Sequence, residues 1–291
     1  MFDPALLLTQ AANGLVLGGL YVLIAIGLSI VFGLLGIVNF AHGAFFALGA
    51  YFGLTLYQQF GWPAVVLAPI GVGLFGMVVE RLLIRRLYDK DPLISLIVTF
   101  ALALLIEAAT RLIWGGLGIP FNPPEALSGV FLWGPVLITR YRASVFFATI
   151  LLLVGLWAFL RFTPYGRILR AGSRDPEMVG LLGIRLPIVL TMVFGLGCAI
   201  AGIAGVLAAP LWTVTPAMQE NAIMPAFVVV TIGGLGSFAG AVIAGLLVGV
   251  VTTLTVQFEP AAAGGVMYVF MALVLLVRPR GLLGERWERF E

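Results

Sequence analysis

Apolar residues fill long, uninterrupted stretches of this chain, and polar residues gather between those stretches. A helix that crosses a membrane requires about twenty mainly apolar residues. Seven stretches read as single crossings of this kind: Ala12–Leu35, Ala41–Tyr57, Trp62–Val79, Leu93–Trp114, Ser144–Leu160, Ile188–Leu211 and Ala261–Val277. The pattern therefore predicts an all-α protein that passes through the membrane many times.

The apolar stretch Ile223–Phe258 is too long for one crossing, and Gly233-Gly-Leu-Gly-Ser237 interrupts it. We interpret it as a short or incomplete helix near Ile223–Leu235, followed by a full one. The chain then has about eight or nine transmembrane helices, depending on whether the short segment crosses or only dips into the membrane.

Composition agrees with a lipid environment. Hydrophobic residues make up 62% of the chain, charged residues only 10%, and the mean hydropathy is +1.14. A soluble domain usually contains about 25% charged residues. The 37 glycines favour close packing of helices within a membrane. We expect one transmembrane permease domain over residues 1–291.

Residues 1–8 lack the basic residues with which a signal peptide usually begins, which argues against a cleaved signal peptide.

The cations predict an orientation, because cytoplasmic loops are enriched in arginine and lysine. One cluster comprises Arg81, Arg85, Arg86 and Lys90, a second lies within residues 161–187, and a third comprises Arg278, Arg280, Arg286 and Arg289. We expect all three clusters and the C-terminus to be cytoplasmic, and the loop Gly115–Tyr141 to be external. An odd number of crossings places the N-terminus outside, and an even number places it inside.

Residues 161–187 form the most polar segment of the chain, which makes them a candidate docking loop for a soluble partner. Asp175 is suited to cap a helix, Pro176 to its first position and Glu177 to its first turn. Gly183 is a typical residue just beyond a helix end. The segment therefore predicts a helix of about two turns over Pro176–Leu182, too short to be stable alone in water.

The apolar residues of this short helix need a surface against which to pack: Met178, Val179, Leu181 and Leu182. They could lie on the membrane interface or on the protein's own helices. We favour a second interpretation, in which the helix docks into a groove on a cytoplasmic partner.

Several function classes are disfavoured. The only lysine, Lys90, lies in Tyr-Asp-Lys-Asp-Pro and not in a glycine-rich phosphate loop, so we expect no ATP hydrolysis by this chain alone. One cysteine, Cys198, and one histidine, His42, exclude an internal disulfide and a multi-histidine metal site. The net charge of +3 is too modest to indicate nucleic-acid binding.

Four motifs occur in an order that is typical of a known family. They are Ile37-Val-Asn39-Phe-Ala-His42-Gly43, Arg170-Ala-Gly-Ser-Arg-Asp175 with Leu182-Gly183-Ile184, Gly233-Gly-Leu-Gly236-Ser237, and Arg278-Pro-Arg-Gly-Leu-Leu-Gly284. Together they resemble the permease subunits of branched-chain amino acid ABC transporters, specifically the smaller of the two permease types. The resemblance extends from about Gly14 to Gly284.

The resemblance implies a non-enzymatic importer subunit in the bacterial cytoplasmic membrane, with a path for hydrophobic or branched-chain amino acids. It implies a second homologous permease subunit, two ATPase subunits that bind the ATP, and an external, periplasmic solute-binding protein. In the family, the loop matching Arg170–Ile184 contacts the ATPase subunits. Many relatives carry an acidic residue where this chain has Ala44, and relatives also transport urea, short amides or aromatic acids, so these solutes are alternatives.

Asn39, His42, Gly43 and Ser237 are the candidate residues of the substrate path. Both Asn39 and Ser237 follow a glycine-rich break and precede Phe-Ala and an apolar helix. If Asn39 caps a helix that begins at Phe40, the free N–H groups there could bind a carboxylate. The alternative is that both residues only cap helices.

Two further acidic residues have nearby cations. Glu107 and Arg111 are spaced i, i+4 and can meet on one helix face, as a compensated pair near the outer end of its helix. We interpret Glu80 with Arg81 in the same way at an inner end. An ion-coupled transporter would need carboxylates in mid-membrane, and Glu107 is the one candidate. An intramembrane hydrolase built on Ser237 and His42 would lack an acid to orient the histidine.

Overall fold

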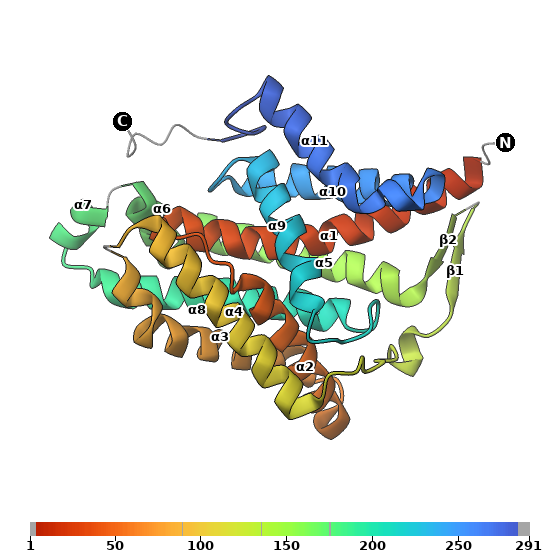
Figure 1. Ribbon diagram of the computed structural model, residues 1–291, viewed down its shortest axis with the longest axis horizontal. Coiled ribbons are helices and arrows are strands. Elements are labelled where there is room, and N and C mark those ends of the chain that lie inside the picture. The colour runs from red at the N-terminus through yellow and green to blue at the C-terminus, as the bar shows by residue number, and fades with distance from the viewer. Residues whose placement is uncertain (1–3, 89, 135, 175, 285–291) are drawn as a thin grey trace. The chain divides into compact units, whose positions relative to one another are not determined.

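The computed structural model describes residues 4–88, 90–134, 136–174 and 176–284 (Figure 1). Every apolar stretch identified in the sequence is helical, but the ends differ from the predicted ones in both directions. The first helix begins at Pro4 and not Ala12, and the helix predicted over Ile188–Leu211 ends at Ala208. The long helices are α1 (Pro4–Leu35), α2 (His42–Phe60), α3 (Ala64–Leu82), α4 (Pro92–Trp114), α5 (Arg140–Phe162), α8 (Leu186–Ala208), α9 (Met218–Gly233), α10 (Phe238–Phe258) and α11 (Ala263–Val277).

The prediction of an all-α, multi-pass membrane protein is confirmed. Within the described residues, seven helical segments are long and apolar enough to cross a membrane: α1, α3, α4, α5, α8, α10 and residues 260–277. The other two predicted elements, α2 and α9, are also helical. Helix α9 has 16 residues. At 1.5 Å per residue it is about 24 Å long, shorter than the hydrocarbon core of a bilayer.

The break between α9 and α10 is where the glycines predicted it. Gly234 and Gly236 both have positive φ, +98° and +81°. Ser237 then caps α10, because its Oγ accepts a hydrogen bond from the amide of Gly240 at 3.1 Å. Helix α9 begins five residues earlier than expected, at Met218 and not Ile223. Its first turn contains Gln219, Glu220 and Asn221, which hydropathy alone assigns to a loop.

Some of the smaller elements were not predicted from the sequence. In the polar segment, the unpredicted helix α6 (Pro164–Arg174) precedes the predicted α7 (Pro176–Leu181). An antiparallel hairpin, β1 (Val130–Trp133) and β2 (Val136–Thr139), pairs Val130 with Thr139 and Trp133 with Val136. The described residues also contain three short 3-10 helices: η1 (Ile84–Leu87), η2 (Glu125–Leu127) and η3 (Pro260–Ala262).

The chain folds into two compact units. The first comprises residues 1–29, 122–150 and 224–291, and the second comprises residues 30–121 and 151–223. In the first unit, α1 and α10 approach each other through Gly18 and Gly245. The core of the second unit is the group α2, α3 and α8, which pack on one another. Gly49 faces Gly202, and Gly205 faces the carbonyl of Phe46. Small residues at these crossings let the helix backbones pack closely.

Candidate functional site

The segment before α2 forms a tight polar turn around Asn39. Asn39 is fully buried, and its Oδ1 accepts a hydrogen bond from the amide of Ala41 at 3.1 Å. Its carbonyl accepts a bond from the amide of His42 at 3.2 Å. Helix α2 therefore begins at His42, and the prediction that Asn39 caps a helix beginning at Phe40 is wrong. An asparagine side chain that bonds to the backbone two residues later makes a turn and delays the helix.

Helix α4 supplies hydroxyl groups to this turn. The Thr99 hydroxyl accepts a hydrogen bond from the amide of Phe40 at 3.2 Å and lies 3.3 Å from the carbonyl oxygen of Val38. Ser95 lies one helical turn earlier on α4 and is also buried. Neither Asn39 Nδ2 nor Ser95 Oγ has a hydrogen-bond partner among the described residues. Buried donors in this state cost about 1–3 kcal/mol each.

The start of α2 also contacts the start of α9. A side chain at Gly43 would lie 2.8 Å from Cβ of Ile223, so Gly43 allows the two helices to approach. The Gln219 amide, on α9, donates to Glu107 Oε2 at 2.6 Å. The second oxygen, Oε1, accepts from Arg111 at 2.6 Å.

The i, i+4 pair of Glu107 and Arg111 is thus confirmed. Its link to Gln219 was missed, although the polar run Gln219-Glu-Asn before an apolar stretch was a usable signal. The second unit therefore places the turn at Asn39 beside Thr99 of α4, and Gly43 beside Gln219 of α9.

Ser237 belongs to the first unit, where the third and fourth sequence motifs pack on each other. The amide of Leu282 donates to the carbonyl of Ile232 at 2.7 Å, and the amide of Leu283 to that of Gly233 at 3.1 Å. Gly281 lies against the carbonyl of Ile232 with a φ of +76°. The segment after α11 thus fixes the glycine break whose last residue, Ser237, caps α10.

Glu80, at the end of α3, is the centre of a buried hydrogen-bond network. Its side chain is fully buried, and its carboxylate accepts from Arg85 Nε at 3.3 Å, Tyr88 at 2.5 Å and Thr191 at 2.6 Å. The predicted pairing with Arg81 is wrong. Consecutive helix residues point to different faces, whereas η1 turns the chain so that Arg85 folds back. Burial and the hydrogen bond to Glu80 raise the pKa of the Tyr88 phenol, so it remains a donor.

The network joins α3 to the start of α8, because Arg85 Nη2 also donates to the carbonyl of Pro187 at 3.1 Å and to Thr191 at 2.6 Å. Sequence reasoning missed Arg85, Tyr88 and Thr191. Thr191 lies 111 residues from Glu80, and hydrophobic periodicity carries no information about such distant pairs.

The short helix predicted over Pro176–Leu182 is present as α7, which ends one residue earlier, at Leu181. Gly183 has a φ of +78°, and its amide donates to the carbonyl of Gly180 at 3.0 Å. Of its apolar residues, Val179 is buried, whereas Met178, Leu181 and Leu182 are 54%, 83% and 73% exposed.

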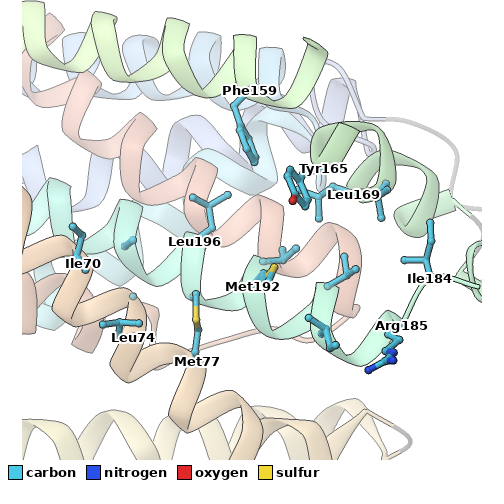
Figure 2. Close-up of a pocket in the computed structure, with 17 residues that line it drawn as sticks. Ile70, Leu74, Met77, Phe159, Tyr165, Leu169, Ile184, Arg185, Met192 and Leu196 are labelled. Atoms are coloured by element: carbon cyan, nitrogen blue, oxygen red, sulfur yellow. The ribbon is translucent and has the colours of Figure 1, made fainter. Parts of the chain in front are cut away.

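The remaining predicted residues of the polar segment are placed as follows. Asp175, the predicted cap, lies outside the described residues. Pro176 and Glu177 form the first turn of α7. Arg170, on α6, donates to the carbonyl of Arg161 at 3.3 Å. Ile184 lies beyond Gly183, on the wall of an apolar cavity (Figure 2).

Comparison with known proteins identifies the family. Residues 10–277 match the family described as "Branched-chain amino acid transport system / permease component". The chain belongs to this family. It is 31% identical over 296 residues to the high-affinity branched-chain amino acid transport system permease protein LivH of Escherichia coli K12, a match that covers 96% of each chain. The corresponding protein BraD of Pseudomonas aeruginosa is 32% identical, with the same coverage. No solved structure matches.

This permease is of the smaller type. Its match to LivM of Salmonella typhimurium, 27% identical, covers 91% of this chain but only 68% of LivM. The LivH-type relatives, in contrast, are matched over nearly their full length. The family and permease type predicted from the four motifs are both confirmed.

Proposed function

We propose that this permease forms the translocation path for hydrophobic, branched-chain amino acids in a bacterial ABC importer, and that separate subunits supply the ATPase. The importer would contain a second, homologous permease subunit, two ATPase subunits that bind the ATP, and a periplasmic solute-binding protein. Its segment 161–187 and its C-terminus would face the cytoplasm. Family membership and the transport function in the names of the LivH-type relatives support the proposal.

The observation that carries the coupling role is the uncovered apolar surface of α7. Met178, Leu181 and Leu182 are more than half exposed, on and directly after a helix of six residues. A helix this short is unstable in water without packing partners, and of these apolar residues its own unit buries only Val179. A hydrophobic groove on an ATPase subunit would complete its packing.

A route for transmitting motion runs from α7 into the membrane helices. Helix α7 packs on α8, and α8 starts four residues after Leu182, the last of the exposed apolar residues. Arg85 and Thr191 then tie the start of α8 to Glu80 on α3. We infer that a displacement of α7 moves α8 and α3 together, because packed helices shift as rigid bodies.

Asn39, His42, Gly43 and Ser237 are the residues that we propose for the substrate path. The amide nitrogen of Asn39, which has no hydrogen-bond partner among the described residues, is a suitable donor to the carboxylate of an amino acid. The Gln219 carbonyl lies against Gly43, and the Gln219 side chain donates to Glu107, so two further polar side chains lie near the start of α2. Polar groups at membrane depth usually face a path or the interior of a helix bundle.

The double substitution Leu181→Ala with Leu182→Ala tests the coupling role. Truncating two central apolar side chains should weaken binding of the ATPase subunits at least about tenfold, since a single buried anchor often contributes more than about 1 kcal/mol. The measurement is the amount of ATPase subunit that co-purifies with the tagged permease, together with solute-stimulated ATP hydrolysis.

Leu117→Ala is the matched control, because Leu117 is equally exposed (86%) but lies in the loop that follows α4. It should leave both measurements unchanged. Full co-purification and full stimulated hydrolysis with the double variant would show that α7 is not the docking element.

A further inference from the structure

The second unit contains an apolar cavity of about 580 Å³ beside the polar segment. Figure 2 shows side chains from α3, α5, α6 and α8 converging on it. Representative lining residues are Leu74 and Met77 of α3, Phe159 of α5, Tyr165 and Leu169 of α6, and Met192 of α8. The lining is almost entirely hydrocarbon, so the cavity is suited to an apolar ligand and not to a polar, hydrated one.

One wall of the cavity is open to the surroundings of the membrane helices. Leu74 and Met192 line the cavity, yet they are 56% and 52% exposed. Both lie on helices long and apolar enough to span a membrane. A hydrocarbon chain of the bilayer can therefore enter sideways, without crossing water.

Helix α6 places cations next to this apolar space. It is amphipathic: Tyr165, Ile168 and Leu169 line the cavity, whereas Arg167 and Arg170 are exposed. Arginine on the polar face and large apolar residues on the other are typical of a helix that lies in the membrane interface. Arg185, just before α8, adds a third exposed cation at the edge of the cavity (Figure 2).

The charged residues that line the cavity favour an anionic ligand over a zwitterionic amino acid. A zwitterionic amino acid needs an acceptor for its ammonium group as well as a donor for its carboxylate. Among the described residues that line the cavity, Arg185 is the only charged one, and there is no carboxylate. The lining therefore fits a ligand with a long hydrocarbon part and an anionic head.

We propose that the cavity binds an anionic phospholipid. One acyl chain occupies the space between α3, α6 and α8, and the phosphate contacts Arg185, with Arg167 and Arg170 on the headgroup side. Basic pockets between membrane helices are established sites for anionic headgroups. None of the residues proposed for the substrate path lines the cavity. Because α6 and α8 flank α7 in the chain, its occupancy links membrane composition to the polar segment.

The test uses the full chain, purified in detergent, stripped of lipid and titrated with phosphatidylglycerol or phosphatidylcholine while bound lipid is counted by native mass spectrometry. We expect one tightly retained phosphatidylglycerol per chain. Arg185→Gln should weaken its binding about fivefold, the contribution typical of one cation near a headgroup. It should weaken phosphatidylcholine binding less, because the choline cation of that lipid already compensates its phosphate. Arg86→Gln, an exposed cation that does not line the cavity, should leave both unchanged.

Met192→Trp tests the apolar part of the site by filling the cavity, and it should abolish retention of both lipids. Its control is Leu105→Trp, on α4, which is 67% exposed and does not line the cavity. Equal retention of phosphatidylglycerol by the parent chain, Arg185→Gln and Met192→Trp would overturn the proposal. So would a Met192→Trp variant that separates a dimer of chains without losing lipid, because the groove would then be a chain–chain interface.

Discussion

Glu80 shows how a charge can be stable in the interior of a membrane protein. Its carboxylate is completely buried, and it is acceptable there only because three donors surround it: Arg85, Tyr88 and Thr191. A buried ion pair of this kind costs desolvation free energy, and removing one partner leaves the other uncompensated. The network therefore fixes the relative position of α3 and α8 more than it raises the total stability.

Glu80→Gln should lower the free energy of unfolding by about 2 kcal/mol. The value is below the usual range of about 3–5 kcal/mol for breaking a buried pair, because the Arg85 side chain is 35% exposed and water can partly solvate it. Thermal unfolding in detergent measures the effect. Arg81→Gln should change stability by less than about 0.5 kcal/mol, as expected for an exposed side chain. A larger loss for Arg81→Gln than for Glu80→Gln would contradict the observed network.

His42→Ala should lower solute uptake at least about tenfold while membrane abundance stays unchanged. The reason is that a hydrogen bond from the proposed path to a charged group of the solute typically contributes about 1.5–3 kcal/mol. Uptake of labelled leucine into cells, with quantitative blotting of the permease, measures both quantities. Phe60→Ala, exposed at the other end of the same helix, is the control. A parallel fall in uptake and abundance would leave His42 with a structural role only.

At the scale of elements, the sequence predicts the long helices well because their length and apolar content are local properties. The same reasoning predicts the short α9 and the two-turn α7, through their glycine ends. It misses α6, because Arg167 and Arg170 interrupt the apolar run, and α6 becomes recognisable only as an interfacial helix.

The site is predictable only in part, for the same reason. The motif Asn39–Gly43 and the cap Ser237 are visible in the sequence, and so is the pair of Glu107 and Arg111. The partner of that pair, Gln219, is 112 residues from Glu107, and the turn that delays α2 depends on one side-chain hydrogen bond. Contacts between distant segments and single turn geometries leave no periodic signal.

Helix packing in the second unit depends on individual glycines, which gives a prediction at this scale. A methyl group at Gly205 would collide with the carbonyl of Phe46 on α2, whereas one at Gly155, on α5, would meet open space. Gly205→Ala should therefore destabilise the protein by about 1–3 kcal/mol, the usual cost of overpacking. Gly155→Ala should stabilise it by up to about 1 kcal/mol through helix propensity. Thermal unfolding of the two variants in one detergent compares them, and equal values would rule out close packing at Gly205.

At the scale of the whole molecule, the proposed function depends on which side of the membrane the polar segment faces. Coupling to a cytoplasmic ATPase requires that α7 be inside. The arginine clusters favour this orientation, since cytoplasmic loops carry most of the cations. The loop that follows α4 must then be outside, because α4 crosses the membrane once between Lys90 and Gly115.

Cysteine labelling can determine this orientation directly, because the native Cys198 is completely buried and gives no background. Leu117→Cys and Leu181→Cys form a matched pair, with the original side chains 86% and 83% exposed. A membrane-impermeant maleimide should label Leu117→Cys in intact cells, and Leu181→Cys only after the membrane is permeabilised. The parent chain should remain unlabelled in both conditions. If Leu181→Cys reacts from outside, α7 cannot meet a cytoplasmic ATPase. The charge rule and the coupling role would then both be wrong for this permease, whatever its family.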